Sequence, residues 1–485
     1  MARSPSPPPL FPFASQQPTS SHETFSPPPS ILIVGSGIFG LSTAWALARR
    51  DLFAKCTITV VDRSDPLNPD AFPAPDAASV DTSRIVRADY ADKAYAALGA
   101  EAQLQWRKQA KPTDLGAQGR YHESGLLLVA DPGPVRIPGE IVAKSDMTGM
   151  DYVRSSWANV LSLAADNPDL AGRIRELPDV DAIRERLGTG GSSGSWGYIN
   201  EGSGWADATA STKWLFDKVK ATGRVTFVSG TVASLEHSGA TVTGAKLSDG
   251  RILSAELVVL ATGAWTGGLV DLSGQATATG QVLGYLDLTE AEQQLLNDMP
   301  VILNLTNGLF IIPPRNRVLK IARHSYGYLN PAVPPTARLP STSPASQPIS
   351  YPLTHLSDPS LSIPQEGADD LRRALREMVP LPGLADRAFT KTRICWYSDT
   401  PTGDFLITYH PQYNGLFIAT GDSGHGFKFM PVLGEKIADC ITHSCPLEFV
   451  GKWSWKPDTE LIITEDGSRG GKPGLTLANE LGKES

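Results

Sequence analysis

Ile31-Leu-Ile-Val34, followed at once by Gly35-Ser-Gly37-Ile-Phe-Gly40, is the stretch that decides the fold. A short, wholly apolar run is typical of a parallel strand buried on both faces, and an amphipathic helix begins directly after the glycines. Gly35 permits a tight turn, Gly37 lets the backbone approach a pyrophosphate, and Gly40 lets helix and strand pack closely. Because a helix N-terminus attracts phosphate, the pattern predicts a dinucleotide-binding unit.

Two further segments support this prediction and narrow the cofactor. The strand-like run Thr57–Val61 ends at Asp62, where an acid would bind the ribose hydroxyls, and this favours FAD or NAD over NADP. Val258-Val-Leu-Ala-Thr-Gly263-Ala-Trp265 is a second buried run that enters a glycine turn. Flavoproteins with two domains return to their cofactor domain with such a segment, so FAD is favoured over NAD.

The rest of the chain alternates between apolar runs and helical patterns, which predicts the α/β class with at least one parallel sheet. Strands are expected at Ile31–Val34, Thr57–Val61, Gly125–Val129, Val225–Val228, Leu257–Ala261 and Val301–Leu305. Helices are expected at Gly40–Arg50, Tyr95–Gln109, Ala208–Thr222 and Asp369–Glu377.

We expect two interleaved domains. The Rossmann-like FAD domain comprises residues 31–95, 206–270 and 390–450. The substrate domain comprises residues 96–205 and 271–389, with a mixed sheet and helices covering one face. Three segments have compositions that bury little apolar surface: a disordered Pro/Ser-rich arm at 1–30, a Pro-rich inserted loop at 331–364 and a flexible tail at 457–485.

Composition excludes several classes of protein. The 485 residues carry 43 Lys and Arg against 51 Asp and Glu, so a formal net charge of -8 offers no positive field for a nucleic acid. The longest apolar runs, such as Leu257–Ala261, are far shorter than the ~20 residues of a membrane span. Four scattered cysteines make neither a disulfide framework nor a metal site. We expect a monomer that binds neither nucleic acid nor membrane.

The N-terminus lacks a secretion signal, and the last residues, Gly482 to Ser485, do not spell a peroxisomal signal. The expected location is intracellular, in the cytoplasm or the peroxisome.

The remaining motifs resemble the FAD-dependent amine oxidases, a family that includes monomeric sarcosine oxidase, fructosyl amino acid oxidases, and pipecolate and saccharopine oxidases. The resemblance covers about residues 31–456. The segments that carry it are Gly35–Gly40, Asp81–Tyr90, Leu319–His324, Arg393–Tyr397 and Gly421–Phe429.

The resemblance implies roles for the reactive residues. Cys395 matches the cysteine that bonds to the 8α position of the flavin, which implies covalent 8α-S-cysteinyl FAD. Lys320 matches a lysine that promotes the reaction with oxygen, because a fixed cation stabilises developing superoxide. Arg87 and Lys428 match the pair that grips the substrate carboxylate, which implies an amino acid substrate.

His324 and Tyr397 would line the substrate side of the flavin, and Arg84 would lie near the flavin ring. The glycines at 421, 424 and 426 would let the chain approach that ring. The expected FAD-binding residues are Gly35, Ser36, Gly37, Ile38, Phe39, Gly40, Asp62, Arg63, Ser83, Arg84, Val232, Gly263, Trp265, Cys395, Asp422, Gly424, His425, Gly426, Phe427 and Lys428.

The substrate branch stays open at this point. Ser83-Arg-Ile-Val-Arg87 resembles the sarcosine, pipecolate and saccharopine branch. By contrast, three segments resemble fructosyl amino acid oxidases: Gly197–Ala206, Pro300–Asn304 and Arg393–Trp396. The leading prediction is an oxidase of a secondary-amine amino acid that uses FAD and O2 and gives an imine and H2O2. The alternatives are a deglycating fructosyl amino acid oxidase, a biosynthetic oxidase of an N-methyl amino acid, a flavin dehydrogenase with another electron acceptor, and a dinucleotide-binding scaffold.

Overall fold

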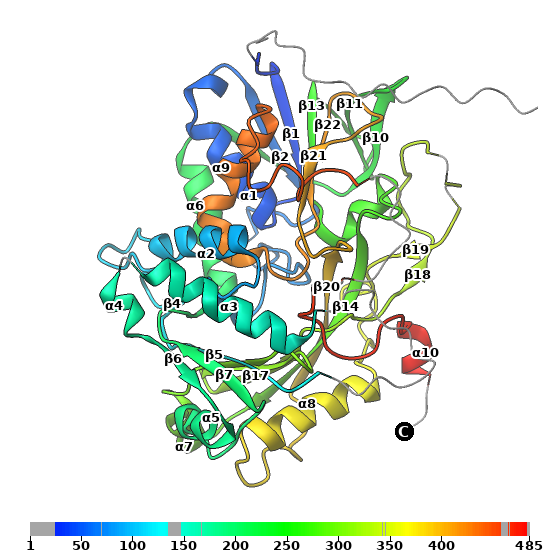
Figure 1. Ribbon diagram of the computed structural model, residues 1–485. Coiled ribbons are helices and arrows are strands. Elements are labelled where there is room, and N and C mark those ends of the chain that lie inside the picture. The colour runs from blue at the N-terminus through cyan, green and yellow to red at the C-terminus, as the bar shows by residue number, and fades with distance from the viewer. Residues whose placement is uncertain are drawn as a thin grey trace, which may run out of the picture.

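The computed structural model describes residues 25–68, 70–133, 147–165, 167–341, 343–344, 346–456, 464 and 466–482. In this part of the chain, a six-stranded sheet forms around the predicted nucleotide strand (Figure 1). Its strand order is β21-β22-β13-β1-β2-β9. All neighbours are parallel except β21 and β22. The strands are β1 (Ser30–Val34), β2 (Thr57–Asp62), β9 (Val225–Ser229), β13 (Leu257–Leu260), β21 (Leu406–Tyr409) and β22 (Leu416–Thr420).

Both faces of this sheet are covered, which explains why β1 is wholly apolar. Ile31 and Ile33 point to one face and pack in the same core as α1 (Ile38–Arg49), α6 (Ala208–Ala221) and α9 (Met430–Ile441). Leu32 and Val34 point to the other face. There they meet a small antiparallel sheet of β10 (Val232–Ser238), β11 (Thr241–Leu247) and β12 (Ile252–Ser254). The α/β prediction is confirmed.

A second sheet lies beside the first in Figure 1 and has the order β20-β14-β17-β16-β15-β5-β7-β6 within the described residues. It is mixed, as expected, because β5 and β15 are parallel while the other pairs are antiparallel. Its strands are β5 (Leu126–Ala130), β6 (Ile174–Leu177), β7 (Trp196–Asn200), β14 (Thr277–Asp287), β15 (Val301–Asn304), β16 (Leu309–Arg315), β17 (Val318–Arg323) and β20 (Lys391–Asp399).

Helices cover both faces of the second sheet, so the expectation of one covered face is wrong. Leu126 and Leu128 share a core with α3 (Gly149–Ala164), whereas the intervening Leu127 and Val129 share a core with α8 (Gln365–Met378). Since successive side chains of a strand alternate, the two helices lie on opposite faces. Figure 1 shows α3 and α8 on either side of the sheet.

Shorter elements complete the fold. The remaining strands are β3 (Arg84–Val86), β4 (Tyr121–His122), β8 (Gly204–Ala206), β18 (Pro331–Ala332) and β19 (Ile349–Ser350). The remaining helices are α2 (Lys93–Trp106), α4 (Pro168–Ala171), α5 (Val180–Leu187), α7 (Glu290–Leu296) and α10 (Leu477–Leu481), with 3-10 turns at η1 (Asp51–Phe53), η2 (Gly263–Gly268) and η3 (Phe427–Phe429). No helix among the described residues is long and apolar enough to cross a membrane.

Two segments differ from the sequence expectation. β20 falls inside the range 390–450 expected in the FAD domain, yet it pairs with β14 in the second sheet. Residues 466–482, expected in a flexible tail, are folded: Ser325 bridges Gly470, Leu329 bridges Thr476, and Leu477 is buried. Most of the N-terminal arm, residues 1–24, lies outside the described residues, as do 457–463.

Candidate functional site

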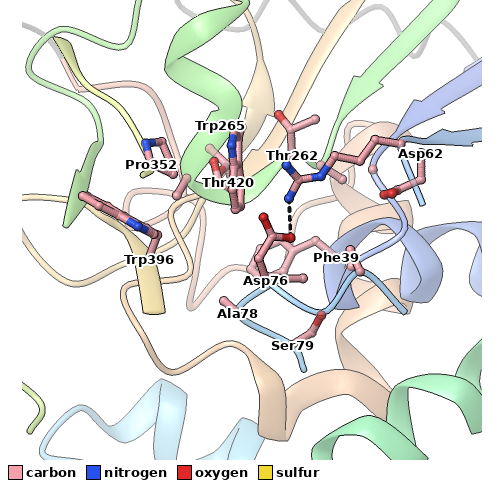
Figure 2. A pocket seen from close by; sticks show the side chains of 18 of the residues that line it. Phe39, Asp62, Asp76, Ala78, Ser79, Thr262, Trp265, Pro352, Trp396 and Thr420 are labelled. Carbon is pink, nitrogen blue, oxygen red and sulfur yellow. Dashed lines mark hydrogen bonds and ion pairs between the residues drawn. The ribbon is translucent and has the colours of Figure 1, made fainter. Parts of the chain in front are cut away.

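A cavity of about 480 Å³ opens at the carboxyl ends of β1, β2 and β13 and reaches β20 of the second sheet. Parallel α/β sheets bind ligands at this edge. In Figure 2, Asp62 and Trp396 lie on opposite sides of the view, so the lining joins both sheets. The expected cofactor residues in the lining are Gly35, Gly37, Ile38, Phe39, Asp62, Arg63, Arg84, Val232, Gly263, Trp265, Asp422, Gly424, Gly426 and Phe427.

The glycine turn has the geometry that a pyrophosphate needs. Gly35 has φ +105°, and a Cβ there would lie 2.5 Å from the Ala261 carbonyl oxygen. A Cβ on Gly40 would lie 1.9 Å from the Gly35 oxygen, so helix and strand touch as predicted. A Cβ on Gly37 would meet only Ser79 Oγ, at 3.9 Å. Gly37 therefore leaves its backbone open to the cavity.

The far end of the turn is fixed by Asp62. Its carboxylate accepts hydrogen bonds from the Ser36 N–H at 2.6 Å and from the Ser64 N–H and hydroxyl at 2.8 and 2.7 Å. The next residue, Arg63, lies over the Trp265 ring at 4.4 Å and pairs with Asp76 at 2.6 Å. The dashed line in Figure 2 marks this ion pair. These bonds hold the expected ribose-binding acid at the cavity wall.

Residues that the sequence reasoning missed form the outer wall. The Pro-rich segment 331–364 contributes Thr336, Tyr351, Pro352 and Thr354 to the lining. Thr354 Oγ1 donates to Asp76 Oδ2 at 3.0 Å, and Trp396 Nε1 donates to the Leu353 carbonyl at 2.7 Å. This segment is thus a wall of the cavity, and its proline content gave no signal of that position.

Cys395 lies beside a buried group of charges. It is 2% exposed, on the same face of β20 as Tyr397, and Arg84 Nη2 is 3.5 Å from its sulfur. Arg84 pairs with Asp81, and Lys320 Nζ lies 2.8 Å from Asp81 Oδ2. Burial lowers the pKa of Lys320 to about 8, although Asp81 opposes the shift. Arg84 lines the cavity, whereas Cys395, Lys320 and Ser83 lie just behind the lining.

The expected carboxylate pair meets at Tyr90. Arg87 lies over the Tyr90 ring at 4.3 Å, and Lys428 Nζ donates to the Tyr90 hydroxyl at 2.7 Å and to the His425 carbonyl at 2.8 Å. Both cations are buried, and burial lowers the pKa of Lys428 well below its usual value. Arg87 Nη1 is buried with no hydrogen-bond partner among the described residues. An anion would satisfy this donor.

His324 and Tyr397 lie together, with ring centroids 5.9 Å apart. Burial and Arg469 lower the pKa of His324 well below its usual range, and burial raises the pKa of Tyr397 above its own. Both side chains are therefore neutral near pH 7. His324 Nε2 contacts Ser468 Oγ at 3.2 Å, and Arg469 lies over the Tyr397 ring at 5.6 Å. Ser468 and Arg469 belong to the segment that was expected to be flexible.

The glycine run at 421–426 lies against aromatic side chains, and its expected approach to the flavin ring stays a prediction. A Cβ on Gly424 would lie 2.2 Å from the Tyr397 ring, and one on Gly426 would lie 2.7 Å from the Phe39 ring. These glycines make room for neighbouring aromatic side chains of the protein itself. Asp422 lines the cavity, and burial raises its pKa to about 6. His425 bonds to Tyr90 and Gly403 instead of lining the cavity.

Comparison with known proteins agrees with this geometry. A family described as "FAD dependent oxidoreductase" matches residues 30–440. The chain belongs to this family. This FAD-dependent oxidoreductase is 35% identical over 462 residues to the amino acid oxidase imqH of Aspergillus flavus, covering 86% of the chain and 93% of the relative. It is 29% identical to the L-saccharopine oxidase of Schizosaccharomyces pombe, covering 88% of the chain and 93% of the relative.

Among solved structures, the oxidoreductase is similar to the deglycating fructosamine oxidase (Amadoriase II) of Aspergillus fumigatus. The TM-score is 0.72 at 27% identity, over 94% of this chain and 97% of that one. The open Gly37 backbone, Asp62 at the cavity wall and a lining that reaches from the nucleotide strands to β20 fit FAD. Among the described residues, no group of three or more His, Cys, Asp or Glu could hold a metal ion.

Proposed function

We propose that this FAD-dependent oxidoreductase is an oxidase of an amino acid whose nitrogen is a secondary amine. The observation that carries the proposal is the meeting of Arg87 and Lys428 at Tyr90, with Arg87 Nη1 unpartnered among the described residues. Arg87 and Lys428 come from distant segments, and a bound carboxylate would favour the charged form of Lys428, so the two side chains can form a receptor for it. Names of relatives support it, since these include saccharopine, sarcosine and N-methyl-L-tryptophan oxidases.

Bound FAD would accept a hydride equivalent from the carbon next to the substrate nitrogen. The chain's own residues bind and orient the substrate. Arg87 and Lys428 hold the carboxylate, and neutral His324 and Tyr397 border the amine without competing for its proton. The product imine is hydrolysed by water, and O2 is the proposed electron acceptor, giving H2O2. We further propose a thioether between Cys395 and the flavin 8α carbon, and a monomeric enzyme.

The test begins with substrate class. The purified protein is mixed without air with sarcosine, pipecolate, saccharopine, an N-methyl amino acid, its unmethylated parent and a fructosyl amino acid, and bleaching of the flavin absorbance is followed. Peroxide is then measured in air. Bleaching by a secondary-amine amino acid but not by its primary-amine parent is the expected result. Bleaching by none of these amino acids would refute the proposal.

A deglycating fructosyl amino acid oxidase is the second candidate. The similarity to Amadoriase II favours it, and fructosyl amino acids are themselves secondary amines. The same panel separates the two candidates, because only the second predicts that the fructosyl compound is the best substrate. The covalent bond is tested apart: flavin colour stays with acid-precipitated wild-type protein and is released from the Cys395→Ala variant.

A further inference from the structure

Asp81 is the centre of a buried group of charges that the proposed function leaves unexplained. Its side chain is 1% exposed, and Oδ2 pairs with both Lys320 and Arg84. Oδ1 accepts the Tyr285 hydroxyl at 2.7 Å. The Arg393 guanidinium also lowers the pKa of Asp81, although its own hydrogen bonds go to the Val80 and Ala77 carbonyls. One carboxylate thus faces three cations.

The three cations differ in one respect. An arginine keeps its proton at any ordinary pH, whereas a buried lysine can lose its proton to escape repulsion. Lys320 is therefore the member whose charge depends on its surroundings. Burial lowers its pKa to about 8, Arg84 lowers it further, and Asp81 raises it. Without the carboxylate, burial and Arg84 would lower the pKa of Lys320 further, with only Cys395 opposing them.

The position of Lys320 is fixed as well as its charge. Lys320 lies on β17 opposite Tyr285 of β14, and its ammonium also donates to the Ser83 carbonyl at 2.7 Å. Other titratable or charged groups facing this cluster from the packed elements are Arg84 on β3, Tyr285 on β14, and Lys391, Arg393, Cys395 and Tyr397 on β20. Asp81 carries the one carboxylate that faces this cluster among the described residues, and it favours the charged form of Lys320 more than Cys395 does.

We propose that Asp81 is a positioning residue that keeps Lys320 protonated and fixed beside Arg84 and Cys395. This inference rests on the proposed function, in which O2 is the electron acceptor, and on the expected role of Lys320 in promoting the reaction with oxygen. Asp81 acts only through Lys320. The carboxylate does not cancel the field of the cluster, because Lys320, Arg84 and Arg393 outnumber it, so the cluster keeps the positive charge that developing superoxide requires.

The first test measures the charge of Lys320 directly in the holoenzyme. The protein is labelled with ¹³Cε-lysine, and the Lys320 signal is identified by its loss in the Lys320→Met variant. We expect a titration midpoint near pH 8 in the wild type. In Asp81→Asn the midpoint falls by more than one pH unit, a more than tenfold change in the proton dissociation constant. An unchanged or higher midpoint in Asp81→Asn overturns the proposal.

Tyr285→Phe is the matched variant, since it removes a hydrogen bond from the same carboxylate and keeps every charge. The freed carboxylate attracts the Lys320 proton more strongly, so this midpoint rises. If Asp81→Asn does not fold, an unchanged or lower midpoint in Tyr285→Phe overturns the proposal by itself.

The second readout is the reaction of dithionite-reduced holoenzyme with O2 from pH 6 to 10. The wild-type rate is expected to fall as the pH rises past about 8. In Asp81→Asn the fall in rate is expected at a lower pH, and the shift should equal the shift of the Lys320 titration midpoint. Identical profiles overturn the link to oxygen. Neither measurement uses an amine, so a failed substrate panel refutes the proposed function and leaves these results standing.

Discussion

Replacing Arg87 with methionine is expected to weaken the oxidation of amino acids and to spare amines that lack a carboxylate. Methionine keeps much of the apolar contact over the Tyr90 ring, 4.3 Å from the guanidinium, and removes the charge and the unpartnered Nη1 donor. Breaking one side of a buried, hydrogen-bonded charge pair costs about 2–5 kcal/mol. At about 1.4 kcal/mol for each tenfold, kcat/KM falls by about 30- to 4,000-fold.

The structure indicates that the loss of kcat/KM lies in the lower half of this range. Lys428 remains, and removal of Arg87 together with binding of the carboxylate favours its charged form. Charged Lys428 can donate to the carboxylate, since the Tyr90 hydroxyl and the His425 carbonyl take two of its three protons. We therefore expect a loss of about 30- to 300-fold for the amino acid, which corresponds to about 2–3.4 kcal/mol.

The assay is the initial rate of peroxide formation with an amino acid substrate and with the matching amine without its carboxylate. Arg49→Met is the control, because it removes an exposed guanidinium that pairs with Glu435, and neither residue lines the cavity. The reasoning is refuted if Arg87→Met slows both substrates equally, because then Arg87 supports the fold of the site and does not bind the carboxylate.

Three other outcomes follow from the structure. Gly40→Ala places a Cβ 1.9 Å from the Gly35 oxygen and should leave purified protein without flavin absorbance, whereas Gly451→Ala, with open space around its Cβ, should keep it. Arg469→Met removes the guanidinium whose Nη2 lies 2.7 Å from Oδ1 of the buried Asp399. The free energy of unfolding, measured in urea, should fall by about 3–5 kcal/mol, and a change under about 0.5 kcal/mol would contradict this. Burial holds the pKa of His324 and of His425 well below 6.5, so near and below that pH the unfolded chain binds more protons than the folded chain. The Tm should therefore fall when the pH is lowered from 7.5 to 5.5. An equal Tm at the two pH values would contradict this reasoning.

The cofactor half of the fold could be predicted because its signals are local. A buried strand, a glycine turn and a helix follow one another in 20 residues, and the required glycines are explained by backbone contacts at Gly35 and Gly40. The second sheet was predicted only as a class. Every residue of Leu126–Ala130 is buried, because helices cover both faces of this sheet. An all-apolar strand of this kind indicates burial on both faces but does not say which elements cover them.

The substrate half depended on contacts between distant segments, which no local pattern specifies. Resemblance supplied Arg87 and Lys428, whose roles stay predictions, but Asp81 was only a member of a quoted motif. The Pro-rich segment was expected to be a surface loop because prolines disfavour regular structure, and yet Thr354 joins it to the cavity wall. Arg469 lies in a polar, Gly-rich stretch whose composition predicts a flexible tail. Its buried ion pair with Asp399 nevertheless ties this stretch to the folded chain.

The contacts of residues 466–482 bear on how the protein matures. Ser468 touches His324, and Arg469 pairs with Asp399, so the proposed amine pocket is bordered by a stretch that leaves the ribosome after the other residues of the site named above. Domains form in the order of synthesis, so the nucleotide sheet can fold while this border is still missing. A nascent chain can therefore recruit its cofactor before it can bind an amine with native geometry. Under the proposed function, peroxide would form efficiently only after residues 466–482 have been added to the folded nucleotide sheet.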